Sequence, residues 1–254
     1  MTKIWILAAC LQQPDNPAPT FEVHMELWKP SVRGRMSLDK AFGVDFLAGG
    51  APEEGNLSFV HDMDLERITG AGRIRFEILT APDLAYVLAF AWSRWQGDHR
   101  LEEDKDLGGG VILPAGTLVE GELKYWDLGA GASQRGESHP WFWSGDVMLA
   151  FYQLKLDASA GGGEMKALTG ALGPVFGGRL GLSIGDRGSI AASGLFHLPL
   201  IAGTPRVELG VRLGIAWDWG RLEAGYSYLA GEGGGTERNR FTMMGPALGL
   251  RISF

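Results

Sequence analysis

From residue 21 onward, apolar and polar residues alternate with a period of two, which is the repeat of a β-strand. In the clearest segment, residues 206–218, one face carries large apolar side chains and the other carries charged and small ones. The same alternation returns in residues 221–228 and 247–254. No segment carries a convincing helical stripe, so the sequence predicts an all-β fold.

The connections between the predicted strands alternate in length. Short turns are expected at residues 81–83, 185–188 and 218–220, and longer polar or glycine-rich loops at about 96–110, 158–170 and 231–240. Outer-membrane barrels are built in this way, with their short turns on the periplasmic side. Residues 129–140 are an exception, because they read as a long connection where the strand count requires a short turn.

We therefore expect residues 21–254 to form a closed, antiparallel, up-and-down transmembrane β-barrel. Counting back from Phe254 gives about 12 strands, with ten or eight as alternatives, and residues 30–70 are the hardest to assign. No run of about 18 apolar residues predicts a membrane-spanning helix. A closed barrel nevertheless satisfies its own backbone polar groups in hydrocarbon.

The charged face of the predicted strands is also rich in Gly, Ala and Ser, whose small side chains suit a confined lumen. An Arg facing lipid near the bilayer midplane costs roughly 2–4 kcal/mol, so the charges should point inward. Their mixed signs predict paired charges in a narrow interior. The expected lumen-lining charges are Arg73, Arg75, Glu77, Glu120, Glu122, Lys124, Lys155, Arg179, Glu208, Arg212, Arg221, Glu223 and Arg251.

Aromatic residues lie where a membrane interface would need them. Trp217 and Trp219 flank a short turn, and Tyr226 and Tyr228 lie toward the far end of the next strand. Two interfacial aromatic girdles require about this spacing. Together with Trp92, these residues are the predicted interface aromatics.

Residues 1–20 are expected to be an export-signal remnant or lipobox followed by a linker. Residues 7–10 (Leu-Ala-Ala-Cys) look like a bacterial lipobox, which makes Cys10 a possible lipidation site. Cys10 is the only cysteine, so the chain can form neither an internal disulfide nor a cysteine metal cluster.

The final strand, Gly245–Phe254, resembles the closing strand of bacterial outer-membrane barrels. Residues 27–34 and 113–119 also resemble segments of uncharacterised barrels of this kind. The resemblance implies that Phe254 is the assembly signal read by the barrel-assembly machinery. It also implies a location in the bacterial outer membrane, in contact with outer-membrane lipid, but it implies no reaction.

The candidate chemistry in the sequence is sparse. The net charge of −7 argues against nucleic acid as a partner, because phosphate binding needs a basic face. His24 lies between Glu22 and Glu26, a set better suited to a hydrogen-bond network than to a metal site. Ser193 and His197 share a face but lie about 13 Å apart by strand rise, too far for direct proton transfer. We expect no catalytic residue, cofactor or metal.

The sequence thus predicts a non-enzymatic, monomeric outer-membrane barrel with a structural or binding role, or a narrow pore for small solutes. Two alternatives remain open at this point. One is a soluble or lipid-tethered ligand-binding β-barrel, and the other is an outer-membrane barrel hydrolase.

Overall fold

A computed structural model describes residues 20–37, 40–41, 44–45, 56–65, 67–107, 110–200, 205–233 and 239–254. The expectations for the export signal and for Cys10 lie outside these residues. Among the described residues, no helix is long and apolar enough to cross a bilayer.

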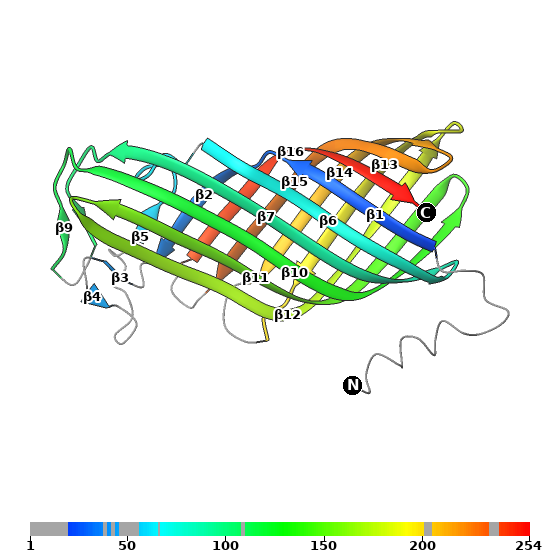
Figure 1. The fold of residues 1–254 in the computed structure, drawn as a ribbon, viewed down its shortest axis with the longest axis horizontal. Helices are drawn as coiled ribbons and strands as arrows, with labels where there is room; N and C mark the ends of the chain where they lie inside the picture. Colours follow the sequence, from blue (N-terminus) through cyan, green and yellow to red (C-terminus); the bar gives the residue numbers. More distant parts are fainter. Residues whose placement is uncertain are drawn as a thin grey trace.

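Ten antiparallel strands of the described chain close into a barrel (Figure 1). They are β1 (Thr20–Trp28), β6 (Arg67–Ala81), β7 (Leu84–Arg100), β10 (Leu118–Ser138), β11 (Trp141–Ala160), β12 (Gly163–Ile184), β13 (Gly188–His197), β14 (Arg206–Trp217), β15 (Gly220–Gly233) and β16 (Asn239–Ser253). β1 pairs with β16 to close the ring. Phe21 and Phe254 exchange backbone hydrogen bonds at this seam, with N–O distances of 3.3 and 2.9 Å.

The main expectation of 12 strands is wrong, and the alternative of ten is the count that the structure has. The described part of residues 30–70 provides no further pair of strands for the barrel wall. It forms short strands at the end of the barrel that carries the long loops (Figure 1). These are β2 (Ser31–Ser37), β3 (Lys40–Ala41), β4 (Val44–Asp45) and β5 (Asn56–Ser58). β2 continues the register of β1 along β16 and then pairs with β5. β8 (Lys105–Asp106) and β9 (Ile112–Leu113) form a separate two-stranded sheet.

Two connections differ from the sequence prediction. Residues 158–170 are not a loop, because β11 and β12 run to Gly161 and Gly162, which alone make the turn. Both glycines have positive φ, 54° and 84°, as the favoured two-residue hairpin turns require. Residues 129–138 belong to β10, so the turn after them is short after all. Both stretches read as loops because their small residues are strand residues facing a crowded interior.

The strands reverse their polarity along their length. In β11, the outward residues are apolar from Trp141 to Phe151 and polar from Gln153 to Ser159. The inward residues change in the opposite sense, from Asp146 near the short turns to the buried Leu154 and Leu156. β10 shows the same reversal at the positions paired with β11, and the outward residues of β7 change from apolar to polar at the paired positions too. We call the two parts the short-turn half and the loop half.

The outer surface of the short-turn half is an apolar band. From Trp141 to Phe151 the strand advances about 33 Å at ~3.3 Å per residue. At a strand tilt of about 45°, this gives a band roughly 23 Å tall. Its middle is well exposed: Val147, Val211 and Leu213 have 57%, 52% and 59% of their surface accessible.

The interior of the loop half is filled by an apolar plug. Leu57 enters from β5, and Phe59, Met63 and Leu65 enter from the segment between β5 and β6; all four are buried. Two facing glycines on the inner wall make room for this segment. A Cβ atom on Gly97 would come within 2.4 Å of the Met63 backbone oxygen, and one on Gly121 within 2.7 Å of the Met63 sulfur. The wall and β2 add further members of the plug, among them Trp28, Val32, Met36, Trp95, Leu123, Tyr125, Tyr152, Leu154, Leu156, Leu229, Phe241 and Met243.

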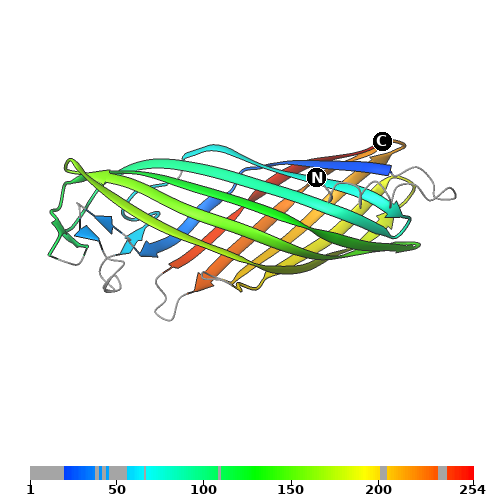
Figure 2. The same ribbon diagram turned by 60° about the horizontal axis from the view of Figure 1, so that its bottom comes forward.

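The strands do not all end at the same height. β7, β10, β11 and β12, coloured cyan-green to yellow-green, extend farther at the loop end than the orange and red β14–β16 (Figure 2). The extension carries the polar outer residues and the apolar inner residues of the loop half. A sheet with these two faces is suited to water outside and to a dry core inside.

Candidate functional site

The short-turn half encloses a polar cavity of about 690 Å³, which we call the lumen cavity. It reaches the short turns, since Pro82 and Asp218 belong to its lining. The described lining residues include nine carboxylates, eight arginines and no lysine. The arginines are Arg73, Arg75, Arg135, Arg179, Arg206, Arg212, Arg221 and Arg251, and the carboxylates are Glu22, Glu26, Glu77, Asp127, Glu137, Asp146, Glu208, Asp218 and Glu223. The two signs therefore almost balance.

Glu26 and Arg212 form the most buried ion pair in the cavity. The guanidinium of Arg212 donates to Glu26 Oε2 at 2.6 and 3.1 Å, and also to the Ser227 hydroxyl at 2.6 Å. Arg73 lies 3.5 Å from the other Glu26 oxygen and pairs with Glu208. The Arg73 guanidinium also lies over the Trp28 ring, 4.1 Å from its centroid. This cluster joins β1, β6, β14 and β15 across the lumen.

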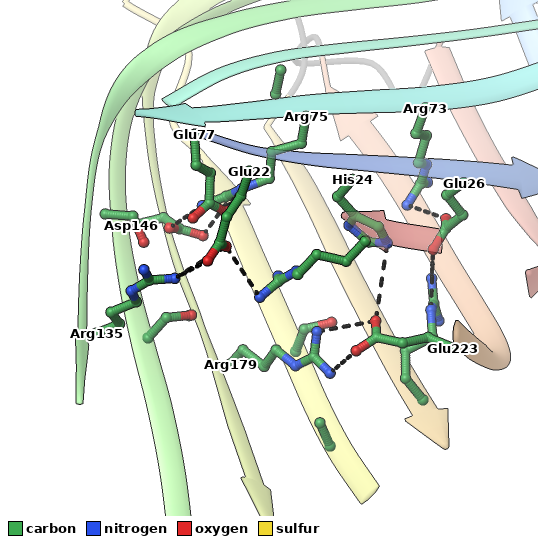
Figure 3. Close-up of a pocket in the computed structure, with 18 of the residues that line it drawn as sticks. Glu22, His24, Glu26, Arg73, Arg75, Glu77, Arg135, Asp146, Arg179 and Glu223 are labelled. Atoms are coloured by element: carbon green, nitrogen blue, oxygen red, sulfur yellow. Dashed lines mark hydrogen bonds and ion pairs between the residues drawn. The ribbon is translucent and has the colours of Figure 1, made fainter. Parts of the chain in front are cut away.

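Glu223 is the hub of a second cluster (Figure 3). Its carboxylate is 1% exposed and accepts two hydrogen bonds from Arg179, at 2.5 and 3.1 Å. Arg221 and His24 approach the same carboxylate at 3.8 and 3.9 Å. The carboxylate of Glu223 on β15 therefore balances the charge of Arg179 on β12, which is not a neighbouring strand.

A third cluster lies between β6 and β11. Arg75 donates to both oxygens of Asp146, at 2.8 and 3.1 Å, and to Glu77 at 2.6 Å (Figure 3). Beside it, Arg135 reaches Glu22 at 3.0 Å. Two-pronged arginine–carboxylate contacts of this kind fix geometry as well as charge. The Arg75–Asp146 and Arg135–Glu22 ion pairs therefore link strands that are not neighbours in the barrel.

Arg206 marks the boundary between the lumen cavity and the apolar plug. It lies 2.6 Å from Asp127, which faces the cavity, and donates to the hydroxyl of Tyr125, which belongs to the plug. Its guanidinium also lies 5.0 Å from the centroid of the Tyr152 ring. Arg206 itself is only 3% exposed. The polar lumen therefore ends at this level.

Nine of the predicted lumen charges line the cavity, namely Arg73, Arg75, Glu77, Arg179, Glu208, Arg212, Arg221, Glu223 and Arg251. The other four do not face the lumen, which corrects the sequence prediction. Glu120, Glu122, Lys124 and Lys155 alternate with buried residues of the plug and lie on the outer face of the loop half. The prediction assumed that charged residues point inward along the whole length of each strand, whereas the outer face of the loop half is polar.

These outer residues pair with one another. Lys124 lies 2.5 Å from Glu122, and Lys155 lies 2.8 Å from Asp157. Partial burial of Glu122 acts to raise its pKa, but the neighbouring Lys124 and Arg94 outweigh it and hold the pKa below its ordinary value. The carboxylate therefore stays ionised at neutral pH.

Several cavity residues were missing from the predicted set. Arg135 fell in the stretch read as a loop, and Arg206 is the first residue of its strand. Asp127 and Asp146 show the alternation of inward positions, which could have identified them. Glu22, His24 and Glu26 do form a polar set on β1, as their spacing indicated, and all three line the cavity.

Of the predicted interface aromatics, Trp92 and Trp219 lie near the two edges of the apolar band, whereas Tyr226 pairs in register with Val211 in its middle. Trp92, Tyr226 and Tyr228 are exposed on the outer face at 37%, 50% and 38%. Trp219 is exposed at the short-turn end, whereas Trp217 packs edge-on against it at 5.2 Å and contributes to the cavity lining. Trp126 extends the upper set, because it pairs in register with Trp92.

The chemistry that a hydrolase would need is not assembled at Ser193 and His197. His197 is 1% exposed and packs edge-on against Tyr152, with ring centroids 5.3 Å apart. Ser193 lines the lumen cavity. Among the described residues, no group of three or more His, Cys, Asp or Glu is arranged to hold a metal ion.

No protein-family model matches the sequence, and no curated protein is similar to it. Bacterial outer-membrane β-barrels are similar in fold. Ail, the attachment invasion locus protein of Yersinia pestis, has 12% identity and a TM-score of 0.39, over 93% of this chain and 97% of that one. The translocator domain of the autotransporter NalP from Neisseria meningitidis has 11% identity and a TM-score of 0.45, over 98% and 92%. The outer-membrane phospholipase A of Escherichia coli has 13% and 0.26, over 99% and 98%. At these scores the similarity assigns no role to this chain.

Proposed function

We propose that this chain is a non-enzymatic outer-membrane β-barrel protein. The short-turn half spans the membrane, and the loop half stands in water outside it. The apolar band supports this proposal, because its height of roughly 23 Å agrees with the ~25 Å apolar band of known outer-membrane barrels. A soluble or tethered barrel would leave that band in water, although soluble proteins rarely expose apolar patches of more than a few hundred Å².

The apolar plug is the observation that favours a structural or binding role over an open pore. Hydrated solutes cross a barrel only through a continuous polar path, and here the polar path ends at Arg206 and Asp127. Beyond them Phe59, Met63 and Leu123 are fully buried side by side in one core. The barrel then anchors the extended loop-half sheet at the cell surface.

A heat-modifiability gel on membrane fractions tests the membrane part of the proposal. We expect the protein in the outer-membrane fraction, with different migration before and after boiling. Recovery as a soluble monomer without detergent would contradict the proposal. The apolar band would then have to be covered by something else.

Conductance in planar bilayers tests the closed lumen. We expect no stepwise current from the wild-type protein and measurable current from the F59A/M63A variant, whose plug is loosened. A narrow solute pore is the second candidate, favoured by the lumen cavity of about 690 Å³ that reaches the short turns. Steady current through the wild-type barrel would support that candidate instead.

A further inference from the structure

Three cations lie side by side on the outer face of the loop half. Lys124 on β10 is paired in register with Arg94 on β7 and with Lys155 on β11. Their side chains are 41%, 49% and 45% exposed. We call Arg94, Lys124 and Lys155 the cation row.

The cation row lies directly beside the upper aromatic residues of the apolar band. One outward position closer to the band, the same three strands carry Trp92, Trp126 and Gln153. Trp126 donates from its indole nitrogen to the Gln153 side-chain oxygen at 2.9 Å, which fixes the ring at the edge of the band. Aromatic rings of this kind lie at the level of lipid headgroups.

The height of the cation row follows from the strand geometry. Two residues along a strand advance about 6.6 Å, which is roughly 5 Å in height at the usual barrel tilt of 35–45°. The three charges therefore lie just outside the aromatic level, where a lipid carries its phosphate. Adjacent strands are about 4.8 Å apart, so the row is roughly 10 Å wide.

The carboxylates that partner the cation row lie on its far side from the band. Glu122 and Asp157 occupy the next outward positions, and Gln96 completes that row. Two carboxylates face three cations, and the cations are the groups nearer the membrane. Each of the three side chains is nearly half exposed, so its charged group can turn toward an anionic headgroup.

We propose that the cation row binds the phosphate groups of lipids in the leaflet next to the loop half. This inference rests on the proposed membrane location of the short-turn half. Arg94 supplies a planar two-pronged donor, and Lys124 and Lys155 supply mobile point charges. The Trp92 and Trp126 rings pack against the acyl chain or glycerol region below the phosphate.

The test compares two double variants of the full chain, each lacking two outer-face cations. K124Q/K155Q removes charges from the cation row. R100Q/K166Q is the matched control, since both residues are exposed on the same strands or their neighbours but farther from the band. Native mass spectrometry of the folded barrels in detergent then measures retention of diphosphorylated lipid A and of its dephosphorylated form.

We expect the wild-type and control barrels to retain the phosphorylated lipid, and K124Q/K155Q to retain it roughly tenfold less. The dephosphorylated lipid should bind all three proteins equally weakly. Equal retention of the phosphorylated lipid by K124Q/K155Q and wild type would overturn the inference, and the cation row would serve only its internal ion pairs. A heat-modifiability gel on the same samples is read separately: loss of the shift in wild type refutes the membrane proposal itself, and its presence in all three leaves the lipid result decisive.

Discussion

The indole nitrogen of Trp95 donates a hydrogen bond to the backbone oxygen of Pro30, with 3.0 Å between the atoms, although Pro30 lies between β1 and β2 and neither of these strands pairs with β7. β6 separates β7 from β1 in the barrel order, and its pairing with β1 ends at Leu27 and Gly72. Beyond that point, toward the loop end, the chain from β1 into β2 pairs only with β16 until β2 meets β5 at Arg35. The Trp95–Pro30 hydrogen bond therefore connects β7 to the link between β1 and β2, in the region where β1 and β6 no longer pair.

Replacing Trp95 by Phe should destabilise the folded barrel. Trp95 is fully buried, so the change leaves the Pro30 oxygen without its donor and opens a small cavity, at a cost of roughly 2–3 kcal/mol. Urea unfolding of the lipid-reconstituted protein measures this. Trp92→Phe is the control, because Trp92 lies on the outer face and should lose less than about 1 kcal/mol. Equal losses would mean that the Trp95–Pro30 hydrogen bond does not stabilise the barrel.

Neutralising Glu223 should also destabilise the barrel. Glu223→Gln leaves Arg179 and Arg221 in the lumen without their shared carboxylate. Breaking a buried ion pair from one side typically costs about 3–5 kcal/mol, and the adjoining cavity reduces this to about 2 kcal/mol through hydration. The unfolding midpoint in urea is the readout. Glu137→Gln, at an exposed position of the cavity lining, should leave that midpoint unchanged.

Introducing a charge in the apolar band tests which solvent surrounds it. Val211→Arg places a guanidinium near the middle of the band, where lipid should impose about 2–4 kcal/mol. Ser159→Arg places the same side chain on the outer face of the loop half, farther from the band, and should be nearly neutral. Unfolding in lipid vesicles distinguishes the two. If both variants were as stable as wild type, the band would face water.

Phe254 should affect assembly more than stability. Its side chain is 73% exposed, and its backbone closes the seam with Phe21 whatever side chain it carries. We expect Phe254→Ser to lower the heat-modifiable fraction in cells severalfold while changing the unfolding free energy of the purified barrel by less than about 1 kcal/mol. Phe21→Ser is the matched control, with 47% of its surface exposed. Normal assembly of Phe254→Ser would argue against a recognition role.

Much of the barrel follows from the sequence because alternation specifies both strand and face. In β14 each outward position from Val207 to Ile215 is apolar, so the inward placement of Glu208 and Arg212 needs no tertiary information. The same holds for Arg73, Arg75 and Glu77 on β6. Where one face of a strand meets lipid and the other lines a lumen, apolar residues point outward and charged residues point inward along the whole strand.

The rest depends on where the solvent changes along a strand, which alternation alone does not specify. In β10, Leu123 and Lys124 alternate just as Leu128 and Gly129 do, yet in the first pair the apolar residue points inward and in the second outward. The difference arises because residues 57–65 of the plug pack against the inner face of the loop half. These residues are distant from β10 in sequence. The partners of Glu223 are equally nonlocal, because Arg179 lies 44 positions away.

The reversal of polarity in β7, β10 and β11 has a consequence for how the barrel responds to bilayer thickness. A thicker hydrocarbon layer would reach the cation row, whereas a thinner one would leave Leu149 and Phe151 wet. Both displacements carry a free-energy penalty, so the protein defines its own depth of immersion. Lipids around it should stretch or compress to match the barrel, which gives it a preference among membranes by thickness alone.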